Sequence, residues 1–300
     1  MKKCLVALVL AALAAAWPGH GRRYAVWGQA DPAVWTAKEV RVVEGFNVPE
    51  CVFPDIAGGA VYVSNIDAEE GAYWSNDRKG HIARLTPEGD VTDARWLDSG
   101  PAAPINSPKG MCRLGDYLYF TDNTRLMRVS LKESGAAPEE IRLPEARMLN
   151  DLASDGKCVY VSDTSLGRAY RVDEAGLATH FSAIPSVNGL TCHDGRVYAV
   201  SWDGHEVYEL DPEGREPAKP FGLAKHFSNL DGIEALEDGS FLVSDFTGNK
   251  VCHIAADRKT VATLVEIESP ADIGLDQGRG LLYVPQFMKD RVSIYRLARQ

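Results

Sequence analysis

The sequence predicts an all-β protein, a six-bladed β-propeller with four-stranded blades. A strand signature, typically Tyr-Val-Ser, recurs along the chain with first residues Tyr62, Tyr119, Tyr160, Ala199, Leu242 and Tyr283. Successive first residues differ by 57, 41, 39, 43 and 41 positions. A period of about 40 residues with several short strands per unit is typical of propeller blades. The longer first interval indicates an insertion, which we place at Asp67–Gly80.

The third unit shows its four strands most clearly. The strands expected there, from the inner to the outer, cover residues 150–154, 158–163, 169–172 and 178–184. An Asp155-Gly156 pair separates the first two, and Asp-Gly between apolar runs is a strong hairpin signal. The other units repeat this order, and residues 211–225 are left without an assigned element.

The sixth unit lacks an outer strand. After Asp290 only one apolar strand follows, Val292–Leu297. The segment Val40–Gly45 precedes the first unit and has no unit of its own. We expect this segment to pair beside Val292–Leu297 and close the ring, because closure removes exposed strand edges.

The N-terminal residues lie outside the predicted propeller. Lys2 and Lys3 precede an apolar run over residues 5–16, which is the pattern of a secretory signal peptide. We expect cleavage after Ala16, with Gly28-Gln29-Ala30 as a second site. A membrane anchor is the alternative, although the run is short for a bilayer. The expected domains are a signal peptide (1–16), an N-terminal arm (17–37) and a single propeller domain (38–300), in a protein exported to the periplasm or secreted.

Composition excludes some function classes. The chain of 300 residues is 45% hydrophobic and 25% charged, as in ordinary globular proteins. Its net charge of -10 argues against nucleic acid as a partner, because phosphate binding needs a basic face. No second long apolar run occurs, so we expect no membrane partner after removal of the signal. A small-molecule substrate or ligand is the expected partner, and the oligomeric state stays open.

The cysteines show no metal or redox spacing. Beyond the signal they are Cys51, Cys112, Cys158, Cys192 and Cys252. None forms a C-x-x-C pair, so zinc and redox motifs are not indicated. We expect buried small hydrophobes, with one disulfide as the alternative.

Oxygen-donating side chains recur ten to twelve residues before four of the signatures. They are Glu50, Asn150, Asn188 and Asp231. Inner strands line the channel of a propeller, so the same phase of each unit meets at one mouth. Two carboxylates and two amides favour one divalent cation, calcium before Mg²⁺, Mn²⁺ or Zn²⁺. The alternative is that these residues form turns.

The same phase in the second and sixth units holds Lys109 and Asp272. These two lie on either side of blade 1 in the predicted ring. They would either form a salt bridge or contact a substrate.

The pattern resembles the senescence-marker-protein/gluconolactonase family of six-bladed propellers, which is similar to paraoxonases and diisopropyl fluorophosphatase. The likeness covers about residues 44–297. It rests on Pro49-Glu50, Leu149-Asn150-Asp151, Val187-Asn188-Gly189 and Leu230-Asp231-Gly232. The resemblance implies a calcium or other divalent ion at these four positions, and a catalytic base or nucleophile at Asp231.

Two positions depart from the family. Paraoxonase-like lactonases place a histidine in the channel phase of the second blade, where this chain has the stretch from Asn106 to Gly110. Gluconolactonases place an arginine two residues before the asparagine of blade 3, where this chain has Met148, with Arg147 one residue away. Histidine chemistry and sugar-lactone specificity are therefore not indicated.

We expect a calcium-dependent hydrolase of a small ester or lactone. In this hypothesis Asp231 and Lys109 are catalytic, and the expected substrate contacts are Asn106, Arg147 and Asp272. The insertion, with Tyr73 and Trp74, would be a lid, a ligand platform or a solvated loop. The alternative function is an exported, non-catalytic propeller whose metal is structural and which binds a small ligand or protein.

Overall fold

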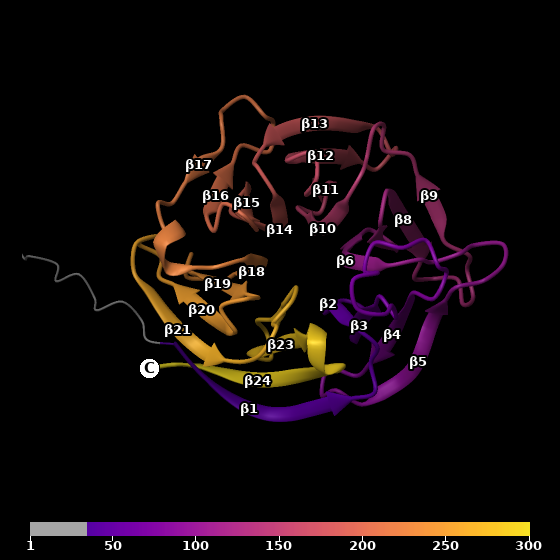
Figure 1. The fold of residues 1–300 in the computed structure, drawn as a ribbon, viewed down its shortest axis with the longest axis horizontal. Helices are drawn as coiled ribbons and strands as arrows, with labels where there is room; N and C mark the ends of the chain where they lie inside the picture. The colour runs from indigo at the N-terminus through magenta and orange to yellow at the C-terminus, as the bar shows by residue number, and fades with distance from the viewer. Residues whose placement is uncertain (1–34) are drawn as a thin grey trace, which may run out of the picture. The chain divides into compact units, whose positions relative to one another are not determined.

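The computed structural model describes residues 35–300. They form six four-stranded antiparallel sheets arranged in a ring, which confirms the predicted six-bladed propeller (Figure 1). The signal peptide, its cleavage sites and most of the N-terminal arm fall outside the described residues. The first strand begins at Trp35, three residues before the expected domain boundary. In the described part, no helix is long and apolar enough to cross a membrane.

Blades 1 to 3 follow the chain from the inner to the outer strand. Blade 1 consists of β2 (Pro49–Asp55), β3 (Ala60–Asn65), β4 (His81–Leu85) and β5 (Val91–Asp98). Blade 2 consists of β6 (Pro108–Leu114), β7 (Tyr117–Asp122), β8 (Arg125–Ser130) and β9 (Glu139–Ile141). Blade 3 consists of β10 (Leu149–Ser154), β11 (Cys158–Asp163), β12 (Arg168–Asp173) and β13 (Ala178–Ala183). The strands of blade 3 match the predicted ones to within a residue or so at each end.

Blades 4 and 5 follow the same order. Blade 4 consists of β14 (Val187–His193), β15 (Arg196–Ser201), β16 (Val207–Leu210) and β17 (Lys219–Pro220). Blade 5 consists of β18 (Leu230–Ala235), β19 (Phe241–Asp245), β20 (Lys250–Ile254) and β21 (Val261–Glu266). The stretch that the sequence left unassigned holds β17 and the start of a 3₁₀ turn, η1 (Ala224–His226).

Blade 6 takes its outer strand from the other end of the described chain. It consists of β22 (Gly274–Asp276), β23 (Leu281–Gln286), β24 (Arg291–Arg299) and β1 (Trp35–Glu44), with the 3₁₀ turn η2 (Phe287–Lys289) before β24. Strands β1 and β24 are antiparallel, with Val43 opposite Val292 (Figure 1). The predicted ring closure is therefore confirmed.

The hydrophobic core is divided among the six spaces between neighbouring blades. Each space holds its own cluster of buried apolar side chains contributed by the two blades beside it. The tyrosines of the signature belong to these clusters; Tyr160 and Tyr283, for example, are each 1% exposed. The signature therefore marks the residue that packs one blade against the next.

In blade 4 the structure corrects the predicted signature by one position. Strand β15 ends at Ser201, where blade 3 ends its second strand at Asp163. Tyr198 rather than Ala199 thus corresponds to Tyr160, and it packs between blades 4 and 5 as Tyr160 packs between blades 3 and 4. The Ala-Val-Ser triplet matches the other copies in its letters but not in its phase.

Candidate functional site

Each predicted cation ligand lies at a bulge in the inner strand of its blade. The pairing of inner and second strands shifts register between Leu149 and Leu152, and the same shift occurs in blades 1, 4 and 5. The two skipped residues in blade 3 are Asn150 and Asp151. A bulge re-aims a side chain out of the alternating pattern of the strand. The alternative that these residues form turns is therefore wrong, because they lie within strands.

Polar residues at the end of the second strand hold the bulge in place. In blade 3 the Ser162 hydroxyl accepts a hydrogen bond from the Asp151 N–H at 2.8 Å. The Asp163 carboxylate accepts the N–H groups of Arg147 at 2.8 Å and Met148 at 3.2 Å, directly ahead of the inner strand. Blade 5 repeats both contacts. The Ser-Asp pair of the signature is thus more than a strand marker, because it positions the residue at the channel mouth.

Close packing of the inner strands explains the glycine after Asn188. A Cβ atom on Gly189 would lie 2.3 Å from the Asp231 carbonyl oxygen of the next inner strand. That distance is far below van der Waals contact with a backbone atom that cannot move independently. The Asn-Gly pair therefore reflects the approach of neighbouring blades at the axis rather than a turn.

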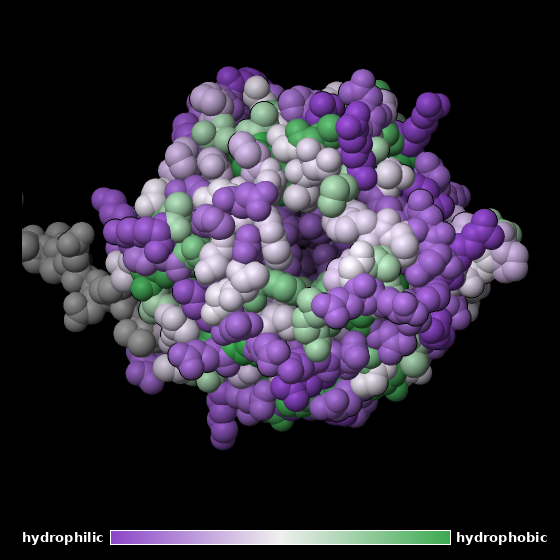
Figure 2. Space-filling view, in the orientation of Figure 1, coloured by the Kyte–Doolittle hydropathy of each residue, from purple (hydrophilic) through white to green (hydrophobic). Residues whose placement is uncertain are grey.

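The four predicted ligands and Lys109 line one pocket of about 440 Å³. Its other lining residues are Ile66, Tyr73, Trp74, Met148, Thr164, Trp202, Asp203, Phe246, Phe287 and Met288. All five predicted residues are buried, and Asn150 is the most exposed at 8%. Figure 2 shows a hollow at the centre of the ring with hydrophilic residues in its depth. The volume lies in the usual range of small-molecule sites.

Charge is concentrated at the floor of this pocket. Burial and the negative charge of Asp231 raise the pKa of Glu50 well above its usual range. Burial, followed by the charge of Asp151, raises the pKa of Asp231 to about 7. The Asn188 side-chain amide donates to Asp231 Oδ1 at 3.0 Å. Two carboxyl groups so placed favour either a proton or a cation.

Two buried oxygens at this floor have no hydrogen-bond partner within the described residues. They are Glu50 Oε2 and Asn188 Oδ1. An unpaired buried acceptor costs free energy unless another group satisfies it. Both atoms belong to predicted ligands, so the residues present fit a hard cation. The described residues hold no group of three His, Cys, Asp or Glu side chains arranged around a metal, since two of the four predicted ligands are amides.

Lys109 is tied to the insertion rather than free in the pocket. Its Nζ donates to the Tyr73 carbonyl at 2.9 Å and the Ser107 carbonyl at 3.2 Å, and lies 4.0 Å from the centre of the Trp74 ring. Burial lowers its pKa to about 8, although the charge of Glu50 opposes that shift. Lys109 therefore both balances the floor charge and fastens Asp67–Gly80 over the pocket.

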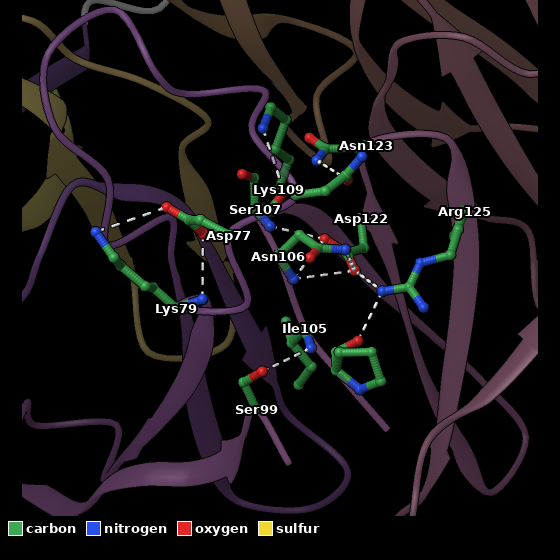
Figure 3. Close-up of polar contacts among 12 residues, drawn as sticks. Asp77, Lys79, Ser99, Ile105, Asn106, Ser107, Lys109, Asp122, Asn123 and Arg125 are labelled. Carbon is green, nitrogen blue, oxygen red and sulfur yellow. Dashed lines mark hydrogen bonds and ion pairs between the residues drawn. The ribbon is translucent and has the colours of Figure 1, made fainter. Parts of the chain in front are cut away.

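The insertion has a second attachment beside Lys109. The Asn123 side-chain amide donates to the Ser75 carbonyl at 2.8 Å and to the Asn76 side chain at 3.0 Å. The Ser107 hydroxyl donates to the same Ser75 carbonyl at 3.1 Å. Figure 3 shows these blade 2 residues gathered at one point. The insertion is thus anchored by blade 2 and is not simply a solvated loop.

Three predicted substrate contacts do not line the pocket. Asn106 lies below it, where its backbone N–H and side-chain amide donate to Asp122 (Figure 3). Arg147 is exposed. Asp272 is buried with its backbone bonded to that of β2. It forms no ion pair with Lys109 among the described residues, because the Lys109 Nζ is bonded to the Tyr73 and Ser107 carbonyls.

A second acidic layer below the mouth escaped the sequence reasoning. Asp151 accepts the N–H groups of Leu152 and Leu190, each at 2.6 Å. Burial nevertheless raises the pKa of Asp151 to about 7, and burial, followed by the charge of Asp151, raises the pKa of Asp272 well above its usual range. Asp151 follows Asn150 directly in the chain. The two bulge residues of blade 3 therefore contribute one side chain to the mouth of the channel and one to the acidic layer below it.

A second repeat phase was also missed. The residue directly after each second strand is Ile66, Asn123, Thr164, Trp202, Phe246 or Phe287. Five of these six residues line the pocket. Backbone N–H groups of Thr164 and Phe246, for example, donate to carbonyls ahead of their inner strands at 2.9 and 2.8 Å. Counting from the end of each signature, rather than from its start, could have identified these six positions.

Comparisons with known proteins bear on the fold. No family model matches the sequence, and no curated protein matches it. A protein proposed to be a gluconolactonase has a TM-score of 0.65 at 16% identity, over 90% of this chain and 94% of that one. A luciferin-regenerating enzyme has 0.64 at 15%, over 87% and 95%. Virginiamycin B lyase from Staphylococcus aureus has 0.62 at 14%, over 88% and 100%. At these identities the likeness shows the propeller fold alone.

Proposed function

We propose that this protein is a metal-dependent hydrolase of a small ester or lactone. The cation, calcium first, would be held by Glu50, Asn150, Asn188 and Asp231. The observation that carries the proposal is the pair of buried, unpartnered oxygens on Glu50 and Asn188 at the floor of a pocket of about 440 Å³. When bound there, a divalent cation would polarise a carbonyl and stabilise an oxyanion.

Three residues of the floor would have different roles in the reaction. Asp231 has a pKa of about 7, near which a general base works best at neutral pH. Asn188 holds one oxygen of that carboxylate at 3.0 Å and leaves the other free to take a proton from water. Lys109 supplies a positive charge that offsets the two carboxylates.

One fold relative and the residues of the pocket lining favour hydrolysis over a histidine-dependent reaction. The gluconolactonase-like relative points to lactone opening. A virginiamycin B lyase with a histidine replaced by alanine is described as catalytically inactive. No histidine lines the pocket in the described part of this chain.

A panel of chromogenic esters and lactones, with calcium and with chelator, tests the proposal. We expect calcium-dependent turnover that Asp231→Asn lowers by at least about 100-fold, since one general base contributes about 10²–10⁴-fold. The control is Asp257→Asn, an exposed turn residue far from the pocket lining. Turnover that ignores chelator, or that survives Asp231→Asn, would contradict the mechanism.

The second candidate is a non-catalytic binding module with a structural metal. The observation in its favour is that Tyr73 and Trp74 of the insertion line the pocket and are fastened there by Lys109. In that case Asp231→Asn lowers only the calcium-dependent rise in melting temperature, and no substrate of the panel turns over.

A further inference from the structure

An aromatic wall stands above the charged floor of the pocket. It consists of Trp202, Phe246, Phe287 and Tyr73. Ring centres are 5.4 Å apart for Trp202 and Phe246, 5.6 Å for Phe246 and Phe287, and 4.8 Å for Phe287 and Tyr73. The last two pairs meet edge to face, a favourable geometry for aromatic rings. The wall is therefore continuous over blades 4, 5 and 6 and the insertion.

Backbone hydrogen bonds hold three of the four residues of the wall, and the wall presents apolar surface to the pocket. Trp202, Phe246 and Phe287 each directly follow a second strand, and each backbone N–H is bonded at 2.8 to 3.0 Å. Phe287 is 8% exposed and packs on the fully buried Ile66. Trp202 and Phe246 are only partly buried, so parts of both rings stay open to the pocket. The chemistry of the floor does not require this surface.

Two polar side chains among the walls already have a partner within the protein. The Thr164 hydroxyl donates to the Val187 carbonyl at 2.8 Å. Asp203 accepts from the Ser186 hydroxyl at 2.6 Å. Met148 fills the position next to Asn150 in the lining, and Arg147 does not reach it. A polyhydroxylated ring would thus bring several hydroxyls against apolar surface, where unpaired polar groups are costly.

We propose that the pocket selects a neutral ester or lactone that carries a flat aromatic group, and that it rejects sugar lactones. The ring would lie against the aromatic wall while the ester carbonyl reaches the floor. A neutral substrate fits because, with a divalent cation bound, the charges of the cation and of Lys109 would be balanced by the three carboxylates of the lining, which are Glu50, Asp203 and Asp231. The reaction named here rests on the proposed hydrolase function, but recognition of the aromatic group does not.

Two measurements keep recognition and reaction apart. The first is binding of butyranilide, a neutral aryl amide, by isothermal titration, which needs no turnover. The second is the ratio of kcat/KM for phenyl butyrate to that for glucono-1,5-lactone, with calcium present. Phe246→Leu is the test variant, because it keeps apolar volume and removes the ring. Phe221→Leu is the matched control, since Phe221 is also partly buried and packs against two aromatic rings, but outside the pocket.

We expect Phe246→Leu to weaken anilide binding about 5- to 20-fold and to lower the kcat/KM ratio by a similar factor. Phe221→Leu should change neither by more than about twofold. Anilide binding with this dependence but no turnover would overturn the hydrolase and leave the aromatic recognition standing. Turnover with a preference for gluconolactone, or anilide binding that ignores Phe246→Leu, would overturn the recognition instead.

Discussion

Near the mouth of the channel, the Asp231 carboxyl group lines the pocket and the Asp151 carboxyl group lies below it, both almost out of contact with water. Burial of Asp231 and Asp151 shifts each pKa from an ordinary 3.8 to about 7. Between these values the folded protein binds more protons than the unfolded chain. Stability from these groups is therefore fully present below about pH 4 and is lost as pH rises through 7.

Calcium should reverse the part of that loss that comes from Asp231, because it would bind the deprotonated Asp231 carboxylate, whereas Asp151 is not among the proposed ligands. We expect the calcium-dependent rise in melting temperature to be small at pH 5 and to grow until about pH 7.5, reaching several degrees at a hundredfold excess over the dissociation constant. Melting curves with calcium and with chelator across this range provide the measurement. Asp231→Asn should flatten the pH dependence of the chelated protein. A calcium shift independent of pH would rule out these carboxylates as the coupled groups.

Lys109 offers a second prediction at this scale. Lys109→Met keeps the length of the side chain but removes its bonds to the Tyr73 carbonyl and the Trp74 ring. We expect the insertion to open more often, with trypsin cleavage at the exposed Arg78 and Lys79 rising roughly five- to tenfold, as loss of one hydrogen bond would allow. Lys132→Met, an exposed lysine paired with a surface aspartate, is the control. If Lys109 served catalysis alone, cleavage would not change.

At the scale of the element, the recurring unit is a bulged inner strand held by its neighbour. Asp163 is fully buried and accepts three backbone N–H groups, from Arg147, Met148 and Leu166. Asp163→Ala leaves these donors without a partner, so we expect a loss of about 2–4 kcal/mol in the free energy of unfolding. Asp163→Asn keeps an acceptor oxygen and should lose less. Urea denaturation measures both.

The control for that series is Asp257→Ala. Asp257 also accepts two backbone N–H groups, but it is exposed and water can replace it. Its loss should stay below about 1 kcal/mol. Since Asn150 follows the segment that Asp163 holds, Asp163→Ala should also reduce the calcium-dependent rise in melting temperature. Equal losses in the two alanine variants would show that the buried aspartate does not hold the bulge.

The bulged inner strand also shows which features could be predicted from the sequence and which could not. Strand order and the ring were predictable because apolar alternation and a period of about 40 residues are local patterns. Asn188 and Asp231 were found because their spacing to the signature is regular. Arg147 was placed in the site because it lies one residue from the arginine position of gluconolactonases, but its side chain is exposed. The aromatic wall was missed because Trp202 and Phe246 form one surface only after the blades meet.

At the scale of the whole molecule, the ring depends on a strand that joins the two ends of the described chain. β1 pairs with β24 along nearly its full length, and its inward residue Val43 belongs to the cluster between blades 6 and 1. Without β1 the edge of β24 would be open, and the cluster would lose one wall. An open edge also invites pairing with other chains.

Two neighbouring valines in this strand allow the loss of stability caused by disturbed core packing to be told apart from the loss caused by any change in the strand. Val43 is 6% exposed and faces Val292, whereas Val42 is 37% exposed and faces Ser293. Val43→Asp buries a charge in an apolar cluster, so we expect a loss of about 3 kcal/mol or more and a greater tendency to aggregate. Val42→Asp changes the same strand by the same chemistry on its outer face, and its loss should stay below about 1 kcal/mol. Urea denaturation and light scattering on both variants provide the comparison.

The same variant also tests whether ring closure affects the metal site. β1 lies on the outside of blade 6, far along the blade from the channel. Calcium should therefore raise the melting temperature of Val43→Asp as much as that of the unaltered protein. A lost calcium response would mean instead that closure of the ring sets the geometry of the mouth.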